Sequence, residues 1–169
     1  MARMVCVWFP NWPLQRLRHE RPELRGRPVV LFSNTGNRGP RVAAWAPSET
    51  QRDNVEGITV GMPLAEAEAL LAGTVGSVAH IELHDPVADL ARLRDLARTC
   101  DIFSPLFGIE PAESPECLLL DVTGCEHLFG GEQSLVDALA DDFRQRGFQV
   151  RAALAPTIGA AWAAAHCLG

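Results

Sequence analysis

One apolar run flanked by carboxylates is the part of the sequence whose residue types could do chemistry. It reads ESPECLLLDVTGCEHLFGG from Glu113 to Gly131 and includes Glu116 and Asp121. Carboxylate oxygens are the ligands that Mg²⁺ prefers. Side chains alternate along a strand, so these two carboxylates point to opposite faces, with about five residues or roughly 16 Å between them. We therefore expect that they cannot share a metal ion, and that Asp121 bonds amides in the strand-end turn.

The other reactive residue types show no spacing typical of a catalytic or metal site. The five cysteines are scattered and form no CxxC pair, which disfavours a disulfide framework and a zinc site. Gly130-Gly131 lacks the pattern of a phosphate loop and predicts the end of a helix. The five histidines are predicted to be surface or capping residues, and Trp45 and Trp162 core residues or, alternatively, interface residues. The chain has no lysine and no tyrosine, which excludes chemistry based on either side chain.

The elements that position this stretch follow from apolar periodicity and from start and stop signals. A capping box is expected from Thr123 to Glu126, because a threonine hydroxyl and a glutamate three residues later can bond each other's amides. The run 41–46 fits either a strand or a helix. Strands are expected at 5–9, 27–32, 77–83, 104–110, 117–122 and 148–155. Helices are expected around 14–21, 61–73, 85–100, 134–145 and from 157 onward.

The order of these elements predicts an α/β (α+β) fold. From Leu83 onward the order is helix, strand, strand, helix, strand, helix. With the strand at 5–9 this gives a small sheet with helices on one face, a ferredoxin-like split βαβ plan. The segment between about Asn11 and Val78 is expected to be an insertion between the first strand and the rest.

Charge is distributed unevenly along the chain. The first 27 residues carry a net charge of +4 and the remainder −10, for a total of −6. An acidic chain is not expected to grip DNA unaided, because phosphate binding needs a basic surface. Five arginines near the N-terminus form either a local phosphate-facing patch or a solvated helix and loop: Arg16, Arg18, Arg21, Arg25 and Arg27. No apolar run reaches the ~18 residues of a membrane span, and the N-terminus lacks the features of a signal peptide.

The ordered motifs resemble the palm and fingers of the Y-family (UmuC/DinB-type) translesion DNA polymerases over essentially the whole chain. The matching stretches are LRGRPVVLF, GITVGMPLAEAEALL, CLLLDVTG and VRAALAPTIGAAWAAA. LDVTGCEHLFGGE, together with PTIGAAWAAA, resembles the catalytically degenerate ImuB-type branch of that family. The resemblance implies a palm at 1–10 and 79–169 and an inserted fingers subdomain at 11–78. It also implies that thumb and little-finger domains belong to the family and are absent from these 169 residues.

In active family members, four carboxylates on two palm strands hold two Mg²⁺ ions. The resemblance places those positions at Trp8 and Pro10 on the first strand and at Glu116 and Cys117 on the second. Only Glu116 could ligate Mg²⁺, since a thiol is too soft a ligand. No metal cofactor is therefore expected. The fingers arginine that holds the triphosphate has Arg52 as its candidate, and the tyrosine and lysine of the family's nucleotide site are missing.

The resemblance implies a protein of translesion synthesis and SOS mutagenesis in the bacterial cytoplasm, associated with the nucleoid during repair. Our leading hypothesis is a non-catalytic scaffold subunit that works with a separate active polymerase. The alternative is a divergent but active Mg²⁺-dependent polymerase, and a third is an unrelated α/β domain. The implied partners are damaged DNA bound through domains outside this chain, a second catalytic polymerase, a sliding clamp and an accessory SOS protein, with no membrane.

Overall fold

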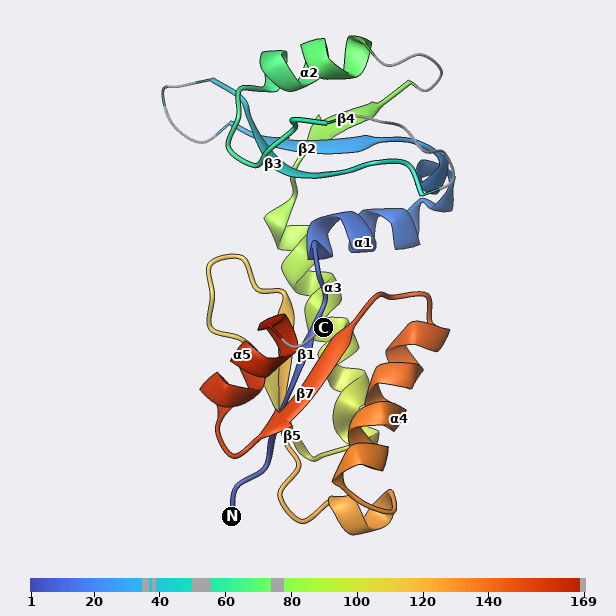
Figure 1. Cartoon of the computed structure of the whole chain (residues 1–169), viewed down its shortest axis with the longest axis vertical. Helices are drawn as coiled ribbons and strands as arrows, with labels where there is room; N and C mark the ends of the chain where they lie inside the picture. Colours follow the sequence, from blue (N-terminus) through green and yellow to red (C-terminus); the bar gives the residue numbers. More distant parts are fainter. Residues whose placement is uncertain (35–36, 38, 50–55, 74–77, 168–169) are drawn as a thin grey trace. The chain divides into compact units, whose positions relative to one another are not determined.

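The computed structural model describes residues 1–34, 37, 39–49, 56–73 and 78–167 (Figure 1). The chain divides into two compact units, one formed by Met1–Gln15 with Val87–Gly169 and the other by Arg16–Pro86. The first helix, α1 (Trp12–Glu20), begins in the first unit and ends in the second. None of the helices in the described residues is long and apolar enough to cross a membrane.

The first unit contains a four-stranded sheet in the order β5-β6-β1-β7, in which every neighbouring pair is antiparallel. With two helices between its strands, this is the split βαβ arrangement expected from the element order. Its elements are β1 (Met4–Trp8), α3 (Pro86–Arg98), β5 (Leu106–Ile109), β6 (Cys117–Asp121), α4 (Glu132–Gln145), β7 (Arg151–Ala155) and α5 (Ile158–Cys167).

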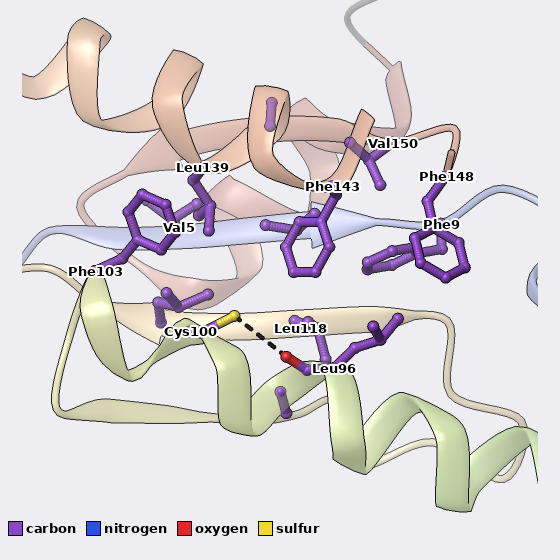
Figure 2. Close-up of a cluster of buried hydrophobic side chains, with 14 of the residues drawn as sticks. Val5, Phe9, Leu96, Cys100, Phe103, Leu118, Leu139, Phe143, Phe148 and Val150 are labelled. Carbon is purple, nitrogen blue, oxygen red and sulfur yellow. Dashed lines mark hydrogen bonds between the residues drawn. The ribbon is translucent and has the colours of Figure 1, made fainter. Parts of the chain in front are cut away.

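Helices were expected on one face of this sheet, but both faces are covered, because α3 and α4 pack on one and α5 on the other. Strand alternation assigns each residue to a face. Val5 and Val7 of β1 lie in the main core with residues of α3 and α4 (Figure 2). Cys6 of β1 and Cys117 of β6 lie on the other face, with Ala161 of α5. Small residues on α5, Ala161 and Ala165, are buried against this face, and the larger side chains of Met4, Trp8 and Leu119 pack partly buried around them.

Aromatic rings fill the end of the main core that follows β1 (Figure 2). The ring of Phe9 meets Trp12, Phe143 and Phe148 edge-on, with centroids 5.3, 5.1 and 6.0 Å away. The indole N–H of Trp12 donates to the carbonyl of Asp89 at 3.0 Å, so its one polar group is satisfied in the core. The position of Phe9 therefore fixes the direction in which the chain leaves β1.

The expected capping box at Thr123–Glu126 is wrong. The Thr123 hydroxyl donates to Asp121 Oδ1 at 2.6 Å and accepts the Arg3 amide at 2.9 Å. In a capping box the hydroxyl oxygen accepts a helix amide; here that oxygen accepts the Arg3 amide instead, and the hydroxyl proton goes to the carboxylate of Asp121. Glu126 does not reach back; its Oε2 atom is buried without a hydrogen-bond partner among the described atoms. The Thr157 cap of α5 is present, with the Ala160 amide donating to its hydroxyl at 3.2 Å.

The second unit contains a three-stranded sheet in the order β3-β2-β4. Its elements are β2 (Val29–Ser33), β3 (Arg41–Ala46), α2 (Leu64–Ala72) and β4 (His80–Leu83). Residues 41–46 thus form a strand. β4 runs parallel to β2, with Val30 opposite Ile81. The expected division placed residues 79–86 with the C-terminal region, whereas this pairing puts β4 in the second unit.

Acidic partners bind most of the N-terminal arginines. Arg18 is buried and donates to Glu49 (3.1 Å) and to the carbonyls of Arg27 (3.2 Å) and Pro47 (2.5 Å). Burial lowers the pKa of Arg18, while Glu49 opposes that shift. Arg16 pairs with Glu20, and Arg21 pairs with Glu82. Of the two readings of this group, a phosphate-facing patch fits poorly, because these charges are already neutralised within the unit.

Candidate functional site

Trp8 and Cys117, two of the four positions singled out in the sequence, lie directly opposite each other. They are register partners on the antiparallel strands β1 and β6. Because partners across a sheet share a face, both side chains point to the side on which α5 packs. The indole at the end of β1 and the thiol at the start of β6 thus lie side by side on one face of the sheet.

Glu116 immediately precedes β6, and its carboxylate is held by groups from the first strand and the turn after it. Trp8 Nε1 donates to Oε2 at 3.1 Å, and the Trp12 amide donates to Oε1 at 3.3 Å. The Glu116 carbonyl accepts the Phe9 amide at 2.9 Å. Both oxygens of this carboxylate are therefore engaged by protein donors.

Pro10, the remaining position, contributes only its backbone. Its carbonyl oxygen accepts a hydrogen bond from Gln15 Nε2 at 2.8 Å. Gln15 also bonds both backbone groups of Gln149, each at 2.8 Å, so it ties the turn after β1 to the segment before β7. Pro10 thus shapes the turn after β1, and its side chain has no atom that could bind a metal ion.

Three rings form a stack that includes Trp8, and one guanidinium lies over the Trp8 ring. The imidazole of His166 lies between two indoles, 4.0 Å from the ring of Trp162 and 4.3 Å from that of Trp8, at interplanar angles of 27° and 24°. The guanidinium of Arg151 lies over the other side of Trp8 at 5.5 Å. His166 Nδ1 carries the proton, because it bonds the carbonyl oxygen of Trp162 at 2.8 Å, which can only accept.

Glu110, which immediately follows β5, binds the start of β6 and the indole of Trp162 through its carboxylate. One carboxylate oxygen accepts the amides of Glu116 (2.6 Å) and Cys117 (3.1 Å), and the other accepts Trp162 Nε1 at 3.0 Å. Each indole of the stack thus donates to its own carboxylate, Trp8 to Glu116 and Trp162 to Glu110. The two acids act as acceptors that orient rings.

The thiol of Cys117 is fully buried beside that of Cys6. A hydrogen bond with Cys6, followed by burial, raises the pKa of Cys117 far above its usual range. His166 Nε2 lies 4.0 Å from its sulfur. A thiol held in its neutral form is neither a nucleophile nor a metal ligand at neutral pH. This residue therefore serves packing.

Asp121 has the structural role expected from the sequence. Its Oδ1 atom accepts the amide of Thr123 at 3.0 Å as well as the hydroxyl. These bonds lower the pKa of Asp121. The carboxylate lies at the far end of β6 from Glu116 and closes the turn before Gly124, whose φ of 80° suits glycine.

Comparison with known proteins settles the family. Residues 7–166 match the impB/mucB/samB family (IMS). The chain belongs to this family. Its members include the Y-family polymerase-like proteins, so the resemblance drawn from the motifs is confirmed.

Two kinds of relative place the chain within the IMS family. The chain is 39% identical over 110 residues to Protein ImuB of Caulobacter vibrioides, which is 65% of this chain and 22% of that protein. The fold resembles the insertion ternary complex of Dbh DNA polymerase (TM-score 0.66, 17% identity, 97% of this chain and 45% of that one). It also resembles DinB from Sulfolobus solfataricus (TM-score 0.66, 17% identity, 92% and 42%). The chain therefore spans less than half of each relative.

The residues present do not fit the Mg²⁺ ions that the IMS family's polymerase relatives imply. Trp8 and Pro10 offer no side-chain oxygen, Cys117 offers a buried neutral thiol, and the oxygens of Glu116 are already bound. No set of three or more His, Cys, Asp or Glu side chains is placed to hold a metal ion within the described ranges. One carboxylate among four positions cannot supply the octahedral oxygen shell that Mg²⁺ requires.

Sequence reasoning placed four positions and missed their neighbours. Glu110, Arg151, Trp162 and His166 converge on Trp8 and Cys117 from β5, β7 and α5. His166 was expected to be a surface or capping residue, and Trp162 a core or, alternatively, an interface residue. The imidazole is instead sandwiched between two indoles, and Trp162 is 42% exposed and so not part of the core. The i, i+4 spacing of Trp162 and His166 on one helix was the available signal. Arg52 lies outside the described residues.

Proposed function

We propose that this chain is the polymerase-like part of a protein of DNA damage tolerance, and that it acts as a non-catalytic scaffold beside a separate active polymerase. The family match and the similarity to ImuB support the first half of this proposal. The chemistry of the four positions supports the second. The first unit corresponds in this proposal to the palm and the second to the fingers, in a protein of the bacterial cytoplasm.

The observation that carries the proposal is the hydrogen bond from Trp8 to Glu116. Nucleotidyl transfer by two metal ions needs carboxylates on both strands, converging on a shared space. Here the first strand presents an indole that donates to the one carboxylate of the second strand. The stack of Trp162, His166 and Trp8 then packs that space with rings. Side chains that replaced the ligands have thus become mutual packing and hydrogen-bonding partners.

A scaffold of this kind needs partners, and the proposal includes those that the family implies. They are damaged DNA held through parts of the protein outside these 169 residues, a catalytic polymerase, a sliding clamp and an accessory SOS protein. The charge of the chain agrees with DNA binding by other parts of the protein. With a net charge of −6 and most N-terminal arginines paired, it offers little basic surface to phosphates.

Primer extension tests the proposal. Purified protein is incubated with a primed template, the four deoxynucleotides and either Mg²⁺ or Mn²⁺, beside an identically purified Glu116→Gln variant. We expect no incorporation above background from either protein. Extension by the parent that Glu116→Gln abolishes would overturn the proposal, because a contaminating polymerase would not respond to that substitution.

A divergent active polymerase is the second candidate, and one observation favours it. Glu110 lies close enough to Glu116 to accept its amide, so a second carboxylate stands near the retained one. Activity that falls with both Glu110→Gln and Glu116→Gln would support this candidate. The engagement of both Glu110 oxygens by protein donors is the reason we rank it second.

A further inference from the structure

One edge of the palm-like sheet, the β5 edge, combines exposed apolar side chains with acidic residues that lie near it in the sequence. β5 is a terminal strand in the order β5-β6-β1-β7, and no strand within the described residues pairs with its outer side. Its sequence, LFGI, contains none of the charges or prolines with which proteins usually protect a sheet edge.

The backbone of β5 has hydrogen-bonding groups directed outward. The Glu110 amide donates to the carbonyl of Cys117 on β6. In an antiparallel pair, the residues that bond the neighbour alternate with residues that point away from it. Phe107 and Ile109 therefore direct their N–H and C=O groups to the free edge, while their side chains pack against the core. The strand is thus anchored on one side and open on the other.

Exposed aliphatic side chains border this edge. Leu106, at the start of β5, is 63% exposed, and Ile102 and Leu128 are 66% and 69% exposed. Ile102 and Leu128 each precede a member of the stacked pair Phe103 and Phe129, which holds the two segments together. We call β5 with these three side chains the β5 margin. Its sheet face also has room, because a Cβ atom added to Gly108 would meet nothing within 4 Å.

The stretch of sequence that contains β5 and its neighbour β6 carries charge of one sign. Residues 99–122 contain five acidic and no basic residues: Asp101, Glu110, Glu113, Glu116 and Asp121. The arginines that flank this stretch in the sequence are already paired, Arg98 with Asp95 and Arg144 with Asp141. We call these five acids, which lie in the segments before, between and at the end of β5 and β6, the acidic rim; their charge repels phosphates and a second copy of the chain, and it attracts a segment that carries basic residues.

We propose that the β5 margin is a docking site for an extended segment of a partner protein, which pairs antiparallel or parallel to β5 as an added strand. The segment has apolar residues at alternate positions and arginine or lysine at its flanks. Backbone bonds to Phe107 and Ile109 supply affinity, and Ile102, Leu106 and Leu128 with the acidic rim supply specificity. This inference rests on the proposed scaffold function, for which it supplies a partner-binding surface.

The test selects twelve-residue peptides from a random display library on the 169-residue chain, then measures binding of the enriched peptides by fluorescence anisotropy. We expect enriched peptides that alternate apolar residues and carry at least two arginines or lysines. Their addition should slow hydrogen exchange at the amides of Phe107 and Ile109. Leu106→Glu should weaken binding at least tenfold, whereas Val87→Glu, a control at a residue that is 78% exposed, should leave it unchanged.

Several results would overturn the docking proposal. They are no enrichment, protection at a site away from β5, displacement of the peptide by single-stranded DNA, or a dimer of the chain that Leu106→Glu dissociates. Matching melting curves of the two glutamate variants show that both are folded. Primer extension reports separately on the scaffold function, so polymerase activity with intact peptide binding, or the reverse, identifies which proposal fails.

Discussion

Trp8 and Cys117 face each other across β1 and β6, and the indole N–H of Trp8 reaches the carboxylate of the residue before Cys117. Two of the four positions that the resemblance assigns to metal ligands therefore lie on neighbouring strands and share a neighbour, Glu116. A carboxylate that lost its hydrogen-bond partners on burial would be costly. Trp8 provides such a partner, which explains how Glu116 stays hydrogen-bonded beside a buried thiol.

Trp8→Phe should destabilise the chain by about 1 kcal/mol, because the ring can still stack on His166 while the hydrogen bond to Glu116 is lost. Glu116→Ala should cost a similar amount. Since both changes remove one interaction, their combination should cost less than their sum. Urea unfolding of the parent, both single variants and the double variant checks this. If the double variant loses as much stability as the two single variants together, the hydrogen bond between Trp8 and Glu116 is contradicted.

Alkaline pH should destabilise the chain through Cys100. Burial raises the pKa of this thiol to about 12 from an ordinary 9.0. Between these values the folded state retains a proton that the unfolded chain releases, so the free energy of unfolding falls as pH rises, by up to about 1.4 kcal/mol per pH unit. The chain has no lysine or tyrosine to titrate in this range, but the raised pKa of Cys117 contributes to the slope in the same direction, so Cys100 accounts for part of it.

Urea unfolding at pH 8, 9 and 10 measures this slope. The variant Cys100→Ala should show a shallower slope, and Cys167→Ala, which removes an exposed thiol, should match the parent. An unchanged slope in Cys100→Ala would mean that burial of this thiol does not drive the effect.

The turn after β6 should depend on Asp121 and not on Glu126. Asp121→Ala removes the acceptor of the Thr123 amide and hydroxyl, and should lower the melting temperature. Glu126→Ala should change stability by less than about 0.5 kcal/mol, since its buried Oε2 atom has no partner among the described atoms. Because the pKa of Asp121 is lowered on folding, its contribution is present at neutral pH and is lost as pH falls through the folded value. A larger loss of stability in Glu126→Ala than in Asp121→Ala would contradict this role of Asp121 and support the capping box.

Arg18→Met should destabilise the second unit by about 3 kcal/mol. The substitution leaves the carbonyls of Arg27 and Pro47 and the carboxylate of Glu49 without their buried donor. Arg27→Met, which alters an exposed side chain nearby, is the matched control and should change stability little. Thermal unfolding followed by circular dichroism compares the two, and equal effects would contradict the assigned role.

Local signals in the sequence were enough for most of the fold. Val5, Val7 and Leu118 lie in short apolar runs, and each such run forms a strand in the structure. What the sequence could not supply was the partner of each residue across the fold. His166 is 49 residues from Cys117, and only the folding of α5 onto the sheet brings them together.

Competition between neighbouring groups accounts for the remaining differences. The Thr123 hydroxyl oxygen accepts the Arg3 amide and not the amide of Glu126, while the hydroxyl proton goes to Asp121. Residues 80–83 had two sheets to join, and parallel pairing with β2 placed them in the second. Neither outcome depends on residue type alone, because each is decided by which partner the surrounding chain holds in place.

The central claim, that the four ligand positions no longer form a divalent metal site, can be tested by NMR at Trp8 itself. The chain has four tryptophans, and the indole N–H of Trp8 lies 3.1 Å from Glu116, so bound Mn²⁺ would broaden that resonance. Our account predicts no selective, saturable broadening of the Trp8 signal as Mn²⁺ is added, in the parent or in Glu116→Gln. Saturable broadening at Trp8 that disappears in Glu116→Gln would contradict it.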